Sequence, residues 1–174
     1  MTIRRIVTGV RGGKSVVVSD ANLEGYEFQS VPGMSQTGLW ATDAVPADLG
    51  SAEEISPETV LPPKGGSRFV QVTFPPDSVM QASDFDPEAA GREYSEQLRD
   101  FAACFEPDSP GMHTTPTVDY GILLEGSLVL ELDDGKTVEL KVGDVVVQNG
   151  TRHAWRNYGA VPAKMMFIML GGST

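Results

Sequence analysis

The feature that most constrains the fold is a series of short apolar segments between residues 119 and 170, separated by turns too short to contain a helix. Segments 120–124, 128–132, 136–142 and 145–148 are divided by Glu125-Gly126, Asp133-Asp134-Gly135 and Gly143-Asp144. Within two of them, leucines or valines alternate with charged residues, which is typical of an antiparallel sheet with one solvated face. Because no crossover helix fits between the segments, we expect an all-β sandwich or closed barrel.

The rest of the chain adds strands and one helix. Strand signals occur at 3–8, 15–19, 38–42 and 67–74, and the run 164–170 is apolar on both faces, as in a central strand. A helix is predicted at 87–105, with Asp86 as its N-cap and apolar residues at steps of three or four. This helix either packs on the outside of the sheet or forms a lid over the barrel mouth. Residues 45–66 are acidic and proline-rich, so we expect a surface loop with at most a helical turn near 52–55.

Length and charge limit the possible functions. A chain of 174 residues is the size of one domain, with N-terminal strands and a proline-rich loop at 1–66 and a barrel with an inserted helix at 67–174. The net charge of −11 makes nucleic acid and anionic membrane surfaces poor partners. A single cysteine and the lack of an apolar run long enough to span a bilayer predict a cytoplasmic protein. The exposed edges of the N-terminal strands predict a homodimer.

The chain has two histidines, His113 and His153, and they stand 40 residues apart with several strand signals between them. Only a folded β-structure brings the two imidazoles together. The pair therefore predicts a metal site or acid–base chemistry, whereas the alternative is two unrelated strand residues.

The spacing around the histidines resembles the two motifs of the cupin superfamily. His113 stands at the first ligand position, Asp119 at the carboxylate position and Gly126 at the closing glycine. Gly143-Asp144 opens the second motif, His153 takes its ligand position and Asn157 follows.

The resemblance implies a double-stranded β-helix, a jelly-roll-like barrel. It also implies a divalent metal, Fe²⁺, Mn²⁺ or Zn²⁺, held by His113, Asp119 and His153. Thr115 replaces the second histidine of the usual first motif, so the metal is expected to be weakly bound or absent.

Strand alternation extends this site into a pocket. If His153 points inward, so do Trp155 and Asn157, and Thr115 faces the same way as His113. The expected pocket residues are Thr115, Trp155, Tyr120, Asn157, Gln71 and Phe69.

The expected ligand or substrate is a small molecule, and three functions of the protein stay open. The first is a metal-dependent enzyme of the dioxygenase, decarboxylase or isomerase class. The second is a metal-free enzyme, a dehydratase or epimerase, in which a histidine and Asp119 act as base and acid. The third is a binding module without catalysis.

Overall fold

Two antiparallel sheets face one another in the computed structural model, which describes residues 2–47 and 59–173. The larger sheet has the strand order β3-β4-β5-β11-β6-β9 and the smaller has the order β10-β7-β8. The strands of the larger sheet are β3 (Tyr26–Glu27), β4 (Ser35–Thr42), β5 (Ser67–Phe74), β11 (Ala163–Gly171), β6 (Thr117–Glu125) and β9 (Val145–Asn149). Those of the smaller sheet are β10 (Ala154–Arg156), β7 (Leu128–Glu131) and β8 (Thr137–Leu140).

The main core lies between these two sheets. Leu123 and Met165 are fully buried on the larger sheet and pack with Leu128 and Leu140 of the smaller one. Residues of β11 are buried alternately along its length, and the strand lies between β5 and β6, so the prediction of a central strand at 164–170 is confirmed. The predicted all-β, jelly-roll-like barrel is likewise confirmed.

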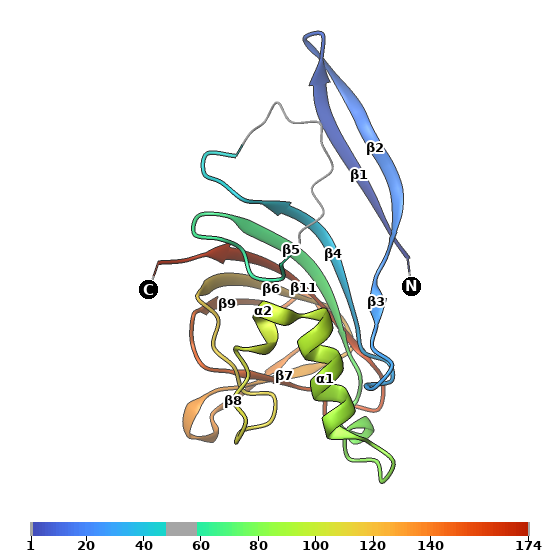
Figure 1. Ribbon diagram of the computed structural model, residues 1–174, viewed down its shortest axis with the longest axis vertical. Coiled ribbons are helices and arrows are strands. Elements are labelled where there is room, and N and C mark those ends of the chain that lie inside the picture. The colour runs from blue at the N-terminus through green and yellow to red at the C-terminus, as the bar shows by residue number, and fades with distance from the viewer. Residues whose placement is uncertain (1, 48–58, 174) are drawn as a thin grey trace.

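The N-terminal strands form a separate hairpin of β1 (Thr2–Arg11) and β2 (Lys14–Glu24), which projects beyond the larger sheet (Figure 1). Ile6, Val10 and Val17 remain largely exposed on it. Arg5 lies over the Trp40 ring of β4, with 5.5 Å from its guanidinium carbon to the ring centroid. The hairpin is therefore joined to the barrel mainly at its base.

The predicted helix is interrupted. α1 spans Pro87–Gln97, α2 spans Arg99–Ala102, and the backbone between them leaves the helical conformation at Leu98 (φ −117°, ψ 19°). Asp86 caps α1 as predicted, because its carboxylate accepts hydrogen bonds from the N–H groups of Glu88 and Ala89. The prediction of one continuous helix at 87–105 is wrong because the chain turns at Leu98, which brings both Leu98 and Phe101 against the barrel interior.

Short 3-10 turns occupy Asp77–Val79 and Asp133–Gly135. The helical turn expected near 52–55 lies outside the described residues. Within the described part of the chain, no helix is both long and apolar enough to cross a membrane.

Candidate functional site

The two histidines meet across a pair of backbone hydrogen bonds. The N–H of His113 donates to the carbonyl of His153 at 2.9 Å, and the N–H of His153 donates to the carbonyl of His113 at 3.0 Å. This isolated antiparallel bridge brings the ring centroids to 4.2 Å. The side chains are only 5% and 2% exposed, so the imidazoles form one buried pair.

Backbone carbonyls fix the same tautomer for both rings. Nδ1 of His113 lies 3.0 Å from the carbonyl oxygen of Gly111, and Nδ1 of His153 lies 2.9 Å from that of Thr151. Because a carbonyl oxygen can only accept, each neutral ring carries its hydrogen on Nδ1 and keeps a lone pair on Nε2. Each imidazole therefore offers one basic nitrogen, as a proton acceptor or as a metal ligand.

Burial keeps these imidazoles neutral. It lowers the pKa of His113. For His153, burial and then the neighbouring His113 lower the pKa to about 4. Both rings are consequently uncharged at neutral pH.

Asp119 is a buried carboxyl group on β6. Its side chain is 6% exposed, and its Oδ1 has no hydrogen-bond partner among the described residues. Burial raises its pKa to about 6, against the opposite effect of the nearby Thr117 hydroxyl. Such an oxygen can meet a polar group of a bound molecule.

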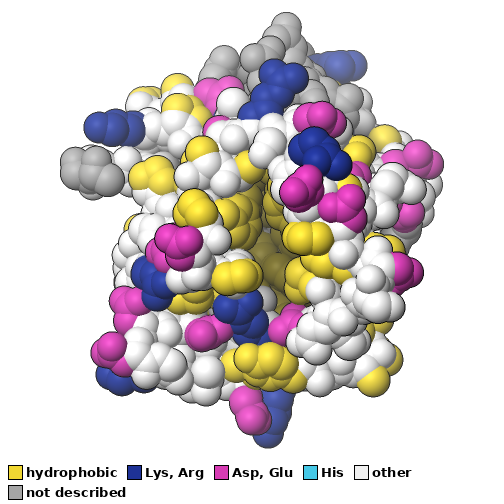
Figure 2. Space-filling model, turned by 60° about the horizontal axis from the view of Figure 1, so that its bottom comes forward, with side chains coloured by type: hydrophobic (Ala, Val, Ile, Leu, Met, Phe, Trp, Pro, Cys, Tyr) yellow, Lys and Arg dark blue, Asp and Glu magenta, His cyan; other side chains and the backbone are white. Residues whose placement is uncertain are grey.

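His113, Asp119 and His153 all line one cavity of about 230 Å³. Aromatic side chains form much of its wall: Phe74, Tyr94, Phe101, Phe105, Trp155 and Phe167. Aliphatic and thioether side chains form another part of it, among them Val31, Met34, Val70, Val72, Met80 and Met169, and the polar residues Gln36, Asp77 and Arg156 also line it. Figure 2 shows a hollow lined by hydrophobic side chains, with acidic and basic side chains around its rim.

The helical segment closes one side of this cavity, because Tyr94, Leu98 and Phe101 all lie in its wall. Glu93 ties α1 to the start of the larger sheet: its carboxylate accepts hydrogen bonds from Tyr26 Oη at 2.7 Å and from the N–H groups of Gln29 and Ser30 at 2.8 and 2.7 Å. Burial acts to raise the pKa of Glu93, but these hydrogen bonds outweigh it and lower the pKa to about 2.

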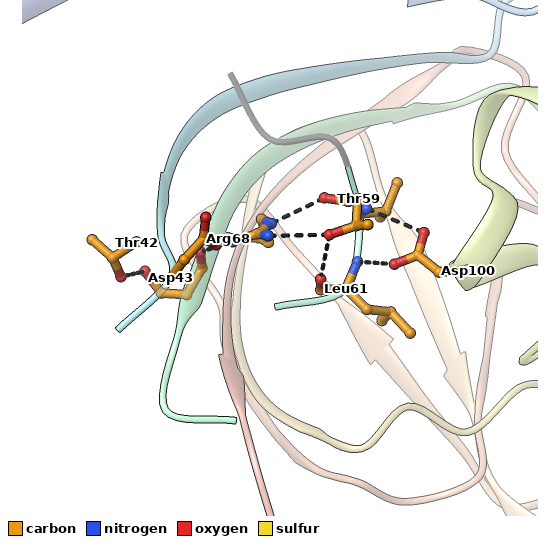
Figure 3. A network of polar contacts seen from close by, with 8 residues as sticks. Thr42, Asp43, Thr59, Leu61, Arg68 and Asp100 are labelled. Atoms are coloured by element: carbon orange, nitrogen blue, oxygen red, sulfur yellow. Dashed lines mark hydrogen bonds and ion pairs between the residues drawn. The ribbon is translucent and has the colours of Figure 1, made fainter. Parts of the chain in front are cut away.

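A second tie holds the segment that contains Val60, another residue of the cavity wall. The Asp100 carboxylate of α2 accepts the N–H groups of Val60 and Leu61 at 3.2 and 2.7 Å. On the other side of this segment, Arg68 donates to the Thr59 carbonyl at 2.9 Å and pairs with Asp43 at 2.6 Å (Figure 3). Both the helices and this segment are therefore fixed around the cavity by charged groups.

Of the predicted pocket residues, Trp155 lies in the cavity wall, with its ring 5.5 Å from that of His153. Three other predictions are wrong because they chose the wrong face of a strand. Tyr120 is 41% exposed on β6, with its side chain opposite to that of Asp119. Val70 and Val72 of β5 line the cavity, which places Phe69 and Gln71 on the outer face.

Thr115 and Asn157 are buried but do not line the cavity either. Thr115 Oγ1 accepts a hydrogen bond from the Thr117 hydroxyl at 2.8 Å. Asn157 donates to the carbonyls of Phe74 and Val161 at 3.0 and 2.9 Å and accepts from the N–H of Gly159 at 3.0 Å. Its amide therefore joins the end of β5 to the turn before β11, which is a structural role.

The sequence prediction also missed wall residues. Val70, Val72 and Phe74 belong to the more apolar face of β5, and this difference between the two faces is the signal that could have found them. Phe101 and Phe105 lie in the apolar stripe of the predicted helix. No local pattern indicates that this stripe faces a cavity.

The donor set fits the predicted metal only in part. The two Nε2 lone pairs suit a divalent ion, as does the unpartnered Asp119 oxygen. However, the residues that the structure describes contain no group of three His, Cys, Asp or Glu side chains that could hold a metal ion together. The arrangement therefore does not fit a three-ligand site, although it does assemble the imidazole pair.

Comparison with known proteins gives both sequence and structural matches. Residues 103–169 match the family described as Cupin domain. Phomopsin biosynthesis cluster protein C' of Diaporthe leptostromiformis is 47% identical over 60 residues, which cover 34% of this chain and 32% of that protein. The match to this relative thus spans about a third of its length. Cupin-domain-containing oxidoreductase srdD of Neurospora crassa is 26% identical over 175 residues, covering 97% of this chain and 76% of that protein.

Among solved structures, a Cupin 2 conserved barrel domain protein from Salinispora arenicola is 14% identical, with a TM-score of 0.41. The alignment covers 80% of this chain and 78% of that one.

Proposed function

Because this chain belongs to the cupin superfamily, we propose that it is an enzyme that transfers protons on a small, mainly apolar molecule bound in its cavity. One observation carries the proposal: two neutral imidazoles and an unpartnered carboxyl group lie in the wall of one largely apolar cavity. A polar group is costly to bury without a partner, so a structural role alone accounts poorly for the unpartnered Asp119 oxygen beside the two imidazoles.

The two kinds of group have complementary roles. An Nε2 lone pair of His113 or His153 can accept a proton from a carbon atom next to a carbonyl group. In its protonated form, which dominates below its raised pKa of about 6, Asp119 can donate its proton to the carbonyl oxygen as the enol forms. In a β,γ-unsaturated carbonyl compound, return of the proton from the imidazolium to the γ carbon shifts the double bond, and the enol proton returns to Asp119 as the carbonyl group re-forms, which completes an isomerisation.

A second candidate is an oxidoreductase that uses a divalent metal. It is supported by the word oxidoreductase in the name of the Neurospora crassa relative and by the two Nε2 lone pairs. The sequence prediction of a metal on His113, Asp119 and His153 therefore stays a prediction, and the lack of a three-group cluster among the described residues weighs against it.

The test is hydrogen–deuterium exchange at carbon, followed by NMR in D₂O with a panel of apolar ketones and untagged protein dialysed against EDTA. We expect exchange with wild type that His153→Ala and Asp119→Asn both reduce by at least about a hundredfold. Tyr120→Phe, on the outer face of β6, is the matched control and should exchange like wild type. Activity that disappears after dialysis and returns with Fe²⁺ or Mn²⁺ would support the second candidate instead.

A further inference from the structure

The residues of the cavity wall also indicate which class of molecule binds there. This inference rests on the proposal above that the cavity is the substrate site. His113, Asp119 and His153 are at most 6% exposed, whereas Met80 is 44% exposed. The polar groups therefore lie at the deep end of the cavity, and Met80 lies at its mouth. Gln36 and Asp77 are further polar residues of the wall, and Asp77 Oδ1 already accepts the N–H of Asn157 at 3.0 Å. We therefore expect a molecule that fills this space to place its main polar group among the three buried polar side chains.

Aromatic rings surround the deep end. The His113 ring lies 5.3 Å from Phe101 and 4.8 Å from Phe105, centroid to centroid. Beyond the His153 ring, Trp155 lies 5.6 Å from Phe167. Because these rings are inclined to one another at different angles, they present both ring faces and ring edges to the cavity. Such surfaces favour an aromatic ligand, whose ring can stack on a face or contact an edge.

The charges at the cavity exclude an anionic ligand. Arg156 is the one Lys or Arg in the described part of the cavity wall, and its guanidinium is already engaged. Its Nε lies 2.6 Å from a carboxylate oxygen of Glu131, and its Nη1 donates to the Pro110 carbonyl at 2.8 Å. A carboxylate or phosphate at the deep end would meet Asp119 and neutral imidazoles, with no cation to offset its loss of hydration.

The mouth differs in character from the deep end. Met80 lies in the wall there, and the half-buried Met34 also lines the cavity. Methionine side chains are unbranched and adapt to groups of different shape. The mouth should therefore accept apolar substituents of variable length, while the deep end selects the ring and its polar group.

We infer that the ligand is an uncharged aromatic ring compound with one hydroxyl or carbonyl group at the deep end and an apolar substituent directed toward Met80. A hydroxyl group donates the hydrogen bond that Asp119 Oδ1 lacks within the protein, whereas a carbonyl group accepts one from the protonated carboxyl group. The rings enclose the aromatic part, and the methionines contact the substituent.

Isothermal titration calorimetry with three probes tests the inference: para-propylphenol, para-propylcyclohexanol and para-propylbenzoate. At neutral pH, we expect the phenol to bind at least about a hundredfold more tightly than the benzoate anion. It should also bind about tenfold more tightly than the cyclohexanol, because the saturated ring loses the aromatic contacts. Within the para-alkylphenols, each added methylene should tighten binding about fourfold until the chain passes the mouth.

Two variants locate the ligand. Val72→Phe places a larger side chain of β5 in the cavity. It should weaken binding of every phenol by about tenfold or more, because the added ring occupies space that the ligand needs. Val147→Phe adds the same group on an exposed strand position and is its control. Met80→Glu, at an exposed position of the wall, should abolish the gain with chain length, because a carboxylate replaces the apolar contact with the substituent.

The outcomes separate this inference from the proposed function, because binding requires no turnover. Equal or tighter binding of the benzoate, equal binding of the cyclohexanol, or insensitivity to Val72→Phe would each overturn the inference. If the phenols bind as expected but carbon exchange needs an added metal, the inference stands and the proposed proton transfer fails. If acyclic ketones exchange through His153 and Asp119 while no phenol binds, the reverse holds.

Discussion

Replacing Asp119 with asparagine should stabilise the protein at neutral pH. Burial raises the pKa of this carboxyl group from an ordinary value of 3.8 to about 6, so the folded state holds the proton more tightly than the unfolded chain does. The stabilisation from the proton on Asp119 is fully present below pH 3.8 and is lost as the pH rises through about 6. Above that pH, the folded protein contains a carboxylate in a mainly apolar cavity, and asparagine removes this charge.

The size of the effect follows from the difference in pKa. A difference of about 2 corresponds to about 3 kcal/mol in the free energy of unfolding, at about 1.4 kcal/mol for each tenfold change in proton affinity. The amide of asparagine is itself polar and has to be buried, so we expect a net gain of about 1 to 3 kcal/mol at neutral pH. Near pH 4, where Asp119 is protonated in the folded protein, the gain should vanish.

Urea unfolding of wild type and Asp119→Asn, from about pH 4 to about pH 8 in buffers with EDTA, measures the effect. The lowered pKa values of His113 and His153 reduce stability as the pH falls, which is opposite to the effect of Asp119. Both proteins contain these histidines, so subtracting one curve of unfolding free energy against pH from the other cancels most of their contribution. Asp134→Asn, in an exposed turn with φ 58°, is the control and should change stability little at any pH. A difference that does not vary with pH, or a variant less stable than wild type at neutral pH, would refute the reasoning.

Four further predictions concern stability, metal and assembly. Trp155→Ala should lower the free energy of unfolding by about 3 kcal/mol, because the indole packs on Phe167 and the core, and thermal unfolding measures it. Asn157→Ala should lower the free energy of unfolding by about 2 to 4 kcal/mol, because its hydrogen bonds are lost. The affinity for para-propylphenol should stay unchanged, and a loss of affinity would show that Asn157 belongs to the pocket. Thr115→His should raise the divalent metal retained per subunit after dialysis against Fe²⁺, Mn²⁺ or Zn²⁺, measured by elemental analysis of untagged protein. Gel filtration at micromolar concentration should give a dimer, and Val17→Lys on the projecting hairpin should shift it toward a monomer, because Val17 is 61% exposed in the isolated chain.

The sequence predicts the elements of this fold well because local patterns specify them. The strand at 67–74 has the predicted bounds, since proline residues end it directly. The Asp86 cap is equally local, because it depends on residues within one helical turn. The meeting of His113 with His153 could also be predicted, through the motif spacing around them.

The choice between the two faces of a strand depends on tertiary structure. Alternation divides Phe69 and Gln71 from Val70 and Val72, but only the packing of the two sheets decides which set faces the cavity. The same holds for Tyr120, which lies on the opposite face of β6 from Asp119.

The character of the site is also a property of the folded chain. The neutral imidazoles and the raised pKa of Asp119 result from burial, and burial depends on helices and loops far away in the sequence, held by Glu93, Asp100 and Arg68. The sequence by itself determined which residues are candidates for the chemistry and where the strands lie, because motif spacing and alternation are local. The tertiary structure decided which side chains share the cavity and in which protonation state, because contact and desolvation arise only when distant segments pack together.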